Sequence, residues 1–221
     1  MTYEDLIQGL VQEGHLRTPR IIEAFQAIKR VDFMRDGTKP LAHVDAPIPI
    51  SYGQTISQPL VVAFMLELLE PKEGEKILDI GSGSGWTTTL LSKIVGTEGK
   101  VIAIELLPQL KEFGERNAAR YNLTEGIAEF ICGDGSKGWE EKAPYDKILV
   151  SAEAKKLPSE LKRQLKVGGR IVIPLGHSIW LFVKKSETEF EEKEYPGYIF
   201  VPLLDESERK EEFLRRYPGD H

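Results

Sequence analysis

The chain has 221 residues, of which 41% are hydrophobic and 29% are charged, and its formal net charge is −6. This apolar content excludes a mainly disordered chain, and no stretch approaches the roughly 20 apolar residues of a membrane-spanning helix. The acidic balance disfavours a nucleic-acid partner, because phosphate binding favours a basic surface.

The first 35 residues are predicted to form two helices. Apolar side chains recur at helical spacing in Leu6–Val11 and in Ile21–Ile28, and Gly14 separates the two runs. Thr18 and Pro19 are typical of a helix N-cap and a first-turn proline. We interpret the pair as packing helices. The alternative, a DNA-reading pair, is disfavoured because the second helix has few basic residues.

Residues 36–58 are rich in proline and glycine, which prevents long regular structure. The segment also holds Ile48, Ile50, Tyr52 and Ile56, so we expect an ordered and packed loop rather than a disordered one. An apolar helix is predicted for Pro59–Leu69.

From residue 76 onward, strands and helices alternate. Strands are predicted at Lys76–Ile80, Val101–Ile104, Ala128–Ile131, Tyr145–Val150 and Gly169–Pro174, and helices at Trp86–Val95, Leu107–Tyr121 and Ser159–Leu165. Short apolar strands alternating with helices indicate an α/β fold, with a mostly parallel twisted sheet covered by helices on both faces. The tail is predicted to add strands at Ile179–Lys184, Glu189–Glu194 and Tyr198–Leu203, and a polar helix at Glu206–Arg216.

The strongest local signal is the run Asp79-Ile80-Gly81-Ser82-Gly83-Ser84-Gly85-Trp86 between a predicted strand and a predicted helix. Glycines allow a tight turn and a close approach of a ligand, and the helix N-terminus attracts negative groups. The spacing differs from the dinucleotide fingerprint, because the sixth position is Trp86, and no Lys-Ser/Thr follows as in a P-loop. A purely structural turn remains the alternative.

Two further acids follow strands in the same unit. Glu105 closes the second strand of this unit, where an acid can bind both hydroxyls of a ribose, and Asp134 closes the third, where it can accept from the amine of adenine. Ligands bind beyond the carboxyl ends of parallel strands, and Asp79 lies near the carboxyl end of the first of these three strands. Three acids at successive strand ends are hard to explain as separate caps.

These features resemble the Rossmann-like S-adenosylmethionine-dependent methyltransferases. Lys166-Val167-Gly168-Gly169-Arg170 before the fifth strand is similar to that class as well. The Asn/Asp-Pro-Pro-aromatic run of amino-group methylases is missing, since Val150-Ser151-Ala152-Glu153-Ala154 stands in its place. Cys132 is wrongly placed for a cytosine-C5 nucleophile, and we interpret it as a small buried thiol. Small-molecule methylases remain open.

The upstream run Gly53-Gln54-Thr55-Ile56-Ser57 closely resembles the signature of the protein-L-isoaspartate O-methyltransferases. The resemblance covers nearly the whole chain, including Gly133-Asp134-Gly135 and Tyr198-Ile199-Phe200-Val201-Pro202-Leu203. One departure is visible. Many members continue Ser-Ala-Pro-His, whereas this chain has Ser57-Gln58-Pro59-Leu60, so no role is assigned to that histidine.

The resemblance implies a repair enzyme that methylates the free carboxylate of L-isoaspartyl residues in damaged proteins, with S-adenosylmethionine as cofactor and no metal. It places Ser57 beside the transferred methyl group. From the residues alone, Ser57 is equally well interpreted as an N-cap before Pro59. Alternatives are a methyltransferase of RNA or of a small acid, or a non-catalytic cofactor-binding protein.

The resemblance also implies a set of site residues. The expected cofactor-binding residues are Gln54, Thr55, Ile56, Asp79, Gly81, Ser82, Gly83, Gly85, Glu105, Leu106, Asp134 and Gly135. The expected substrate-binding residues are Tyr52, Tyr198, Val201, Pro202 and Leu203.

The whole chain is predicted to be one methyltransferase domain. Residues 1–58 form a helical cap and active-site loop, 59–176 the cofactor-binding core, and 177–221 the C-terminal strands and helix. The single cysteine excludes an internal disulfide, and the acidic start Met1–Asp5 is unlike a secretion signal. We therefore expect a cytoplasmic protein, acting as a monomer, without a membrane or nucleic-acid partner.

Overall fold

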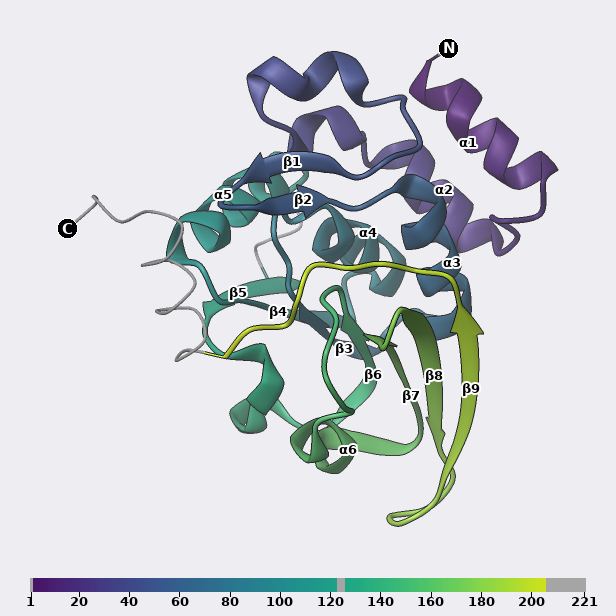
Figure 1. Ribbon diagram of the computed structural model, residues 1–221, viewed down its shortest axis with the longest axis vertical. Coiled ribbons are helices and arrows are strands. Elements are labelled where there is room, and N and C mark those ends of the chain that lie inside the picture. The colour runs from purple at the N-terminus through teal and green to yellow at the C-terminus, as the bar shows by residue number, and fades with distance from the viewer. Residues whose placement is uncertain (1, 123–125, 206–221) are drawn as a thin grey trace.

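The computed structural model describes residues 2–122 and 126–205, and its centre is a seven-stranded sheet in the order β5-β4-β3-β6-β7-β8-β9 (Figure 1). The strands from β5 to β7 are parallel, while β8 and β9 are antiparallel to their neighbours. The strands of this sheet are β3 Lys76–Ile80, β4 Lys100–Glu105, β5 Ala128–Cys132, β6 Tyr145–Val150, β7 Leu165–Leu175, β8 Ser178–Lys184 and β9 Phe190–Pro196. The predicted mostly parallel α/β sheet is confirmed.

Helices cover both faces of the sheet, as predicted. They are α1 Tyr3–Gln12, α2 Pro19–Ala27, α3 Pro59–Leu69, α4 Trp86–Val95, α5 Pro108–Ala119 and α6 Ser159–Gln164. Alternate side chains of the strands enter different cores, because successive residues of a strand point to opposite faces. Ile77 packs in the cluster that includes α1 to α5, whereas Leu78 packs in the cluster that includes α6.

The two N-terminal helices are the packing helices that the sequence predicts. Ile21, Ala24 and Phe25 of α2 are fully buried, and Phe25 meets Trp86 of α4 edge to face with ring centroids 5.6 Å apart. The helical cap therefore packs directly on the helix that follows the glycine loop.

Residues 36–58 are ordered and packed, as expected, but they also contain a β-hairpin that the sequence does not reveal. The short helix η1 covers Arg30–Phe33 and η2 covers Asp36–Leu41, before β1 Ile48–Ser51 and β2 Gln54–Ile56. Strands of four and three residues, one of them containing Pro49, give too little alternation to predict. The turn between them has positive φ at Ser51, Tyr52 and Gly53.

The C-terminal segment corrects one prediction. The strands β8 and β9 are present, but Tyr198–Leu203 is not a strand of the sheet. Gly197, with φ of +99°, turns the chain away after Pro196, and Pro202 has no N–H to donate. The segment instead crosses the strand ends (Figure 1), and the predicted helix Glu206–Arg216 lies outside the described residues.

The side chain of Cys132 is exposed, so its interpretation as a buried thiol is wrong. Cys132 is the last residue of β5, which is an edge strand of the sheet and leaves this position uncovered. Within residues 2–122 and 126–205, no helix is long and apolar enough to cross a membrane.

The start of α2 is held by a carboxylate from α3. Thr18 is the N-cap residue, but its hydroxyl donates to Glu67 Oε2 at 2.8 Å instead of accepting from the helix. Glu67 Oε1 accepts from the backbone N–H groups of Arg17 and Thr18, both at 2.8 Å. The predicted cap position is therefore correct, and a distant acid satisfies the local donors.

Replacing Glu67 with alanine is expected to lower the free energy of unfolding by about 2–4 kcal/mol, because it leaves three donors without their acceptor in a partly buried site. Chemical denaturation measures this loss. Glu73→Ala is the control, since it breaks only the exposed ion pair with Arg20 and should cost less than about 1 kcal/mol. Equal losses of unfolding free energy in the two variants would contradict the role of Glu67 as the acceptor at the start of α2.

Candidate functional site

A cavity lies at the carboxyl ends of β3, β4 and β6, where the strand order reverses direction. It encloses about 1150 Å³ of space, open solvent at its mouth included. Its wall also includes the β1–β2 turn region and residues Val201–Leu204 of the C-terminal segment. Open α/β sheets bind ligands at such a switch point.

The glycine loop after β3 forms the floor of this cavity. Gly81, Ser82 and Gly83 line it, whereas Gly85 lies behind the wall as the N-cap of α4, with φ of +83°. A Cβ on Gly85 would meet the carbonyl oxygen of Gly114 at 2.5 Å, so α5 packs against the loop backbone. This pairing of Gly85 with Gly114 could not be predicted, because Gly114 stands inside a helical pattern.

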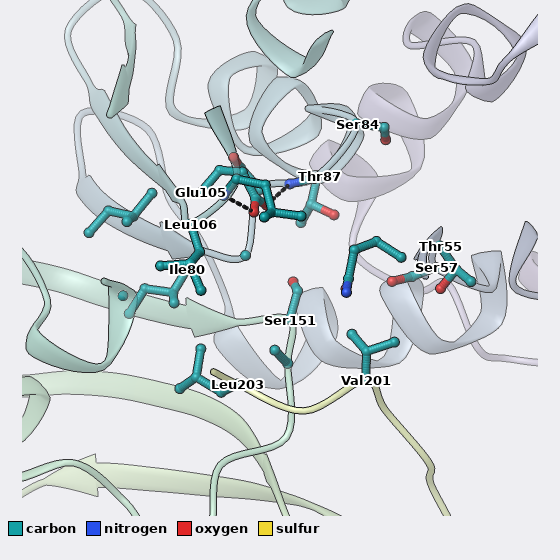
Figure 2. Close-up of a pocket in the computed structure, with 18 of the residues that line it drawn as sticks. Thr55, Ser57, Ile80, Ser84, Thr87, Glu105, Leu106, Ser151, Val201 and Leu203 are labelled. Atoms are coloured by element: carbon teal, nitrogen blue, oxygen red, sulfur yellow. Dashed lines mark hydrogen bonds between the residues drawn. The ribbon is translucent and has the colours of Figure 1, made fainter. Parts of the chain in front are cut away.

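Glu105 ends β4 and is 8% exposed on the cavity wall. Its Oε2 accepts from Gly83 N at 2.9 Å and its Oε1 accepts from Leu107 N at 3.0 Å (Figure 2). Burial raises the pKa of this carboxyl, and the N–H donors of Leu107 and Gly83 oppose the rise. The carboxylate is thus fixed in one orientation and retains lone pairs for further donors.

Asp79 does not line the cavity, contrary to expectation, because its side chain is completely buried beneath the glycine loop. Its Oδ2 accepts from Thr88 Oγ1 at 2.6 Å, and its Oδ1 has no partner among the described residues. Burial raises its pKa to about 7, the Thr88 bond lowers it, and the nearby Glu105 raises it further. Asp79 therefore supports the loop from behind.

Asp79→Asn is expected to reduce the pH dependence of stability. The pKa in the folded state is about 7, above the ordinary 3.8. The stability contribution is therefore complete below about pH 4 and is lost as the pH rises through 7. Between pH 5 and 8 the wild-type melting temperature should fall more than that of the variant, whose amide can still accept from Thr88. Equal falls in the melting temperatures of both proteins would contradict the ionisation of a buried Asp79 in this pH range.

Asp134 also lies off the cavity wall, although Gly133 and Gly135 on either side line it. Its Oδ1 accepts from Ser136 N at 3.0 Å and from Ser136 Oγ at 2.6 Å, and its Oδ2 lies 3.0 Å from Lys137 Nζ. The carboxylate caps its own turn in this structure, because the amide two residues on is within easy reach. Its expected contact with adenine stays a prediction.

The active-site loop predicted from the sequence forms another wall. The lining residues there are Tyr52, Gln54, Thr55, Ile56 and Ser57. Ser57 is not the N-cap of α3, since Gln58 holds that position without a side-chain cap bond. In the view of Figure 2, Ser57 and Thr55 lie together, and Ser151 lies between them and Glu105.

The C-terminal segment supplies Val201, Pro202 and Leu203 to the wall, but not Tyr198. Val201 O accepts from Glu153 N at 2.8 Å, and Leu203 N donates to Glu153 O at 2.7 Å, so one edge of the segment is held. Tyr198 instead stacks on Phe64 of α3, with ring centroids 5.4 Å apart.

His177 is the histidine of the described residues that lies at a strand end of the sheet, and it does not line the cavity. His177 lies in the exposed turn between β7 and β8, outside the cavity wall, with Nδ1 3.8 Å from Glu153 Oε2.

Sequence reasoning missed several lining residues. They are Ile80, Ser84, Thr87, Ile104, Leu107, Gly133, Ser151, Ala152 and Leu204. Ser151 follows β6, at the position where amino-group methylases carry their Asn/Asp-Pro-Pro-aromatic run. That position could have identified Ser151 as a site residue. The others carry no signal beyond their place at a strand end, in or just after the glycine loop, or at the end of the C-terminal segment.

Comparison with known proteins gives one consistent family. The model of the family described as protein-L-isoaspartate(D-aspartate) O-methyltransferase matches residues 1–208. A curated protein-L-isoaspartate O-methyltransferase of Pyrococcus abyssi is 44% identical over 205 residues, which are 90% of this chain and 93% of that protein.

Two solved structures share the fold. One, a protein-L-isoaspartate O-methyltransferase, aligns with a TM-score of 0.85 at 27% identity over 97% of this chain and 70% of that one. The other is a Plasmodium falciparum protein in complex with S-adenosyl-L-homocysteine, with a TM-score of 0.83 at 24% identity over 92% and 99% of the chains.

Proposed function

The chain belongs to the protein-L-isoaspartate(D-aspartate) O-methyltransferase family, and we propose that its cavity is where a methyl group passes from S-adenosylmethionine to the free carboxylate of an L-isoaspartyl residue. The observation that carries this proposal is the family match over residues 1–208, which span every residue of the cavity wall. The methyl ester then collapses to a succinimide that reopens partly to normal aspartate, which makes the reaction a repair of damaged proteins.

The cavity wall fits a cofactor that contains a nucleoside. The Glu105 carboxylate can accept from ribose hydroxyls, and Ile80, Ile104 and Leu106 offer apolar surface to a base. The hydroxyl of Ser82 is buried on the wall and has no partner among the described residues, so it can bind a polar group of a ligand. When bound, S-adenosylmethionine supplies a methyl group activated by a sulfonium sulfur.

We assign the cofactor to the expected residues that line the cavity. These are Gln54, Thr55, Ile56, Gly81, Ser82, Gly83, Glu105, Leu106 and Gly135. Asp79 and Gly85 act indirectly, since they hold the shape of the glycine loop from behind.

Ser57 orients the substrate carboxylate in this proposal. The carboxylate is already ionised at neutral pH, because such groups titrate near pH 3–4, so it needs no base to become a nucleophile. Among the described residues, the wall contains no histidine, lysine or arginine, and hydroxyls such as that of Ser57 are among the available donors. The chain's contribution is therefore alignment of the carboxylate and exclusion of water.

Extended peptides are proposed to lie along Val201–Leu203. One edge of this segment is bonded to Glu153, while the Val201 N–H has no partner among residues 2–122 and 126–205. A backbone donor of this kind recognises a peptide without reading its side chains, as a repair enzyme requires.

Val201→Pro is expected to raise KM for isoaspartyl peptides several-fold while leaving cofactor affinity unchanged, because it removes one donor and restricts φ. Val201→Ala, which retains the N–H, is the matched control. Peptide kinetics and calorimetric titration with S-adenosylhomocysteine provide the two readings. Equal shifts in KM and in cofactor affinity would show that the segment has only a structural role.

The proposed function is tested with a panel of methyl acceptors. The purified protein receives S-adenosylmethionine with a labelled methyl group and, separately, an isoaspartyl peptide, its aspartyl twin, RNA and a small dicarboxylic acid. Label in the isoaspartyl peptide alone is the expected result. Label in RNA or in the small acid instead, or in none of the acceptors, would contradict the proposal.

We further propose that residues 1–221 act as one domain and as a cytoplasmic monomer. One buried cluster extends from Ile7 of α1 through Leu66 and Leu110 to Ile179 of β8, which supports a shared core. The single cysteine is typical of proteins from a reducing compartment. Sedimentation equilibrium tests the monomer.

A further inference from the structure

Arg30, the first residue of η1, carries a fully buried guanidinium, with 0% of the residue exposed. A buried charge is costly unless its hydrogen bonds are satisfied. Burial lowers its pKa to about 10, so the group remains protonated at neutral pH. No carboxylate of the described residues lies within ion-pair distance of this guanidinium.

The guanidinium donates to carbonyl oxygens spread over a long segment. Nη1 donates to Val44 O at 2.9 Å and, more weakly, to Ala42 O at 3.4 Å. Nη2 donates to Ala46 O at 2.7 Å and to Ser57 O at 3.0 Å. Because the guanidinium is a rigid planar fork, these bonds fix the path of residues 42–46 relative to Ser57.

Asp45, within this clamped segment, holds the residues that follow Ser57. Its Oδ2 accepts from Gln58 Nε2 at 3.0 Å, and its Oδ1 accepts from Leu60 N at 2.9 Å. The backbone is thus held at Ser57 by Arg30 and immediately after it by Asp45.

Arg30 also contacts the opposite part of the site. Its Cζ lies 5.6 Å from the ring centroid of Trp86, the cavity-lining first residue of α4. The same side chain therefore connects the Ser57 segment with the helix that begins at the glycine loop.

We propose that Arg30 is a positioning residue for methyl transfer, which together with Asp45 fixes the backbone around Ser57 so that its hydroxyl meets the substrate carboxylate. This inference rests on the proposed function. Arg30 itself touches no substrate, because it lies off the cavity wall. Its Nη1 and Nη2 donate to backbone carbonyls, and its buried Nε has no partner among the described residues.

The test compares Arg30→Lys with Arg170→Lys. Lysine keeps the charge but has a single nitrogen, so it cannot reach Val44, Ala46 and Ser57 together. Arg170 is the matched control, since its guanidinium donates to Leu68 O at 2.8 Å and pairs with Glu70 near the other end of α3. We expect Arg30→Lys to lower kcat about tenfold with peptide KM changed less than about twofold, and Arg170→Lys to leave kcat within about twofold.

A double-mutant cycle separates positioning from general loosening. If Arg30 acts through the Ser57 hydroxyl, Arg30→Lys should cause no further fall in kcat once Ser57 is alanine. An equal fall in kcat in both backgrounds would overturn the proposal, as would a loss of thermal stability in Arg30→Lys with kcat intact.

A reading independent of activity is hydrogen exchange. We expect faster exchange of residues 42–60 in Arg30→Lys than in wild type, and no change there in Arg170→Lys. Unchanged exchange in Arg30→Lys overturns the proposal. A wild-type protein that fails to methylate isoaspartyl peptides instead overturns the proposed function. If Arg30→Lys does not fold, Asp45→Asn replaces it, with the same expected fall in kcat and the same dependence on Ser57.

Discussion

Ser57→Ala is expected to lower kcat for an isoaspartyl peptide by about 10- to 100-fold, with the dissociation constant of S-adenosylhomocysteine changed less than about threefold. The hydroxyl lies on the cavity wall and would donate to a charged carboxylate, and such a bond contributes roughly 1.5–3 kcal/mol. That energy corresponds to the stated fall in rate when the bond aligns the reacting atoms. Single-turnover kinetics at saturating cofactor provide the measurement.

The control for this variant is Ser159→Ala, which removes a hydroxyl at the start of α6, away from the cavity. Ser57→Thr keeps the hydroxyl and should recover part of the rate. A kcat unchanged in Ser57→Ala would show that this serine does not orient the substrate.

The same measurement separates orientation from proton abstraction. At saturating cofactor, the rate of the chemical step should be nearly flat from about pH 6 to 8, because the substrate carboxyl is already ionised. A steep rise centred near pH 7 would instead show that a titrating group acts as a base in the chemical step.

The second large effect is expected for Glu105→Ala, which should lower the affinity for the cofactor at least about tenfold. Bonds from two ribose hydroxyls to a carboxylate contribute roughly 1.5–3 kcal/mol each, and 1.4 kcal/mol corresponds to a factor of ten. The variant also leaves Gly83 N and Leu107 N without their acceptors, which loosens the glycine loop.

Calorimetric titration with S-adenosylhomocysteine measures the affinity, and circular dichroism confirms the fold. Glu129→Ala is the matched control, because Glu129 lies on the neighbouring strand β5 and pairs with Lys142 outside the cavity. An affinity of Glu105→Ala within about twofold of the wild type would remove Glu105 from the cofactor site.

Much of the fold follows from patterns that the sequence displays openly. The strands β3, β4 and β6 are short apolar runs next to helical patterns, and buried parallel strands require that pattern. The glycine loop and Glu105 were recognisable because their chemistry depends on position along the chain rather than on tertiary contacts.

The remaining features depend on contacts between distant residues. Asp134 and Asp79 have the right positions for ligand-binding acids, yet one caps its own turn and the other is buried under the loop. The apolar run Tyr198–Leu203 has the pattern of a strand, but Gly197 turns it across the strand ends. Such outcomes are set by side-chain direction and burial, which a one-dimensional pattern does not contain.

The most direct test of the account is repair of a single peptide. An isoaspartyl peptide is incubated with the wild-type protein and S-adenosylmethionine, and mass spectrometry follows the products, with the aspartyl twin as control. We predict a methyl ester that gives way to a succinimide and then to a growing share of normal aspartyl peptide, while the twin stays unmodified. An isoaspartyl peptide that gains no methyl group, or a twin methylated equally fast, would contradict the account.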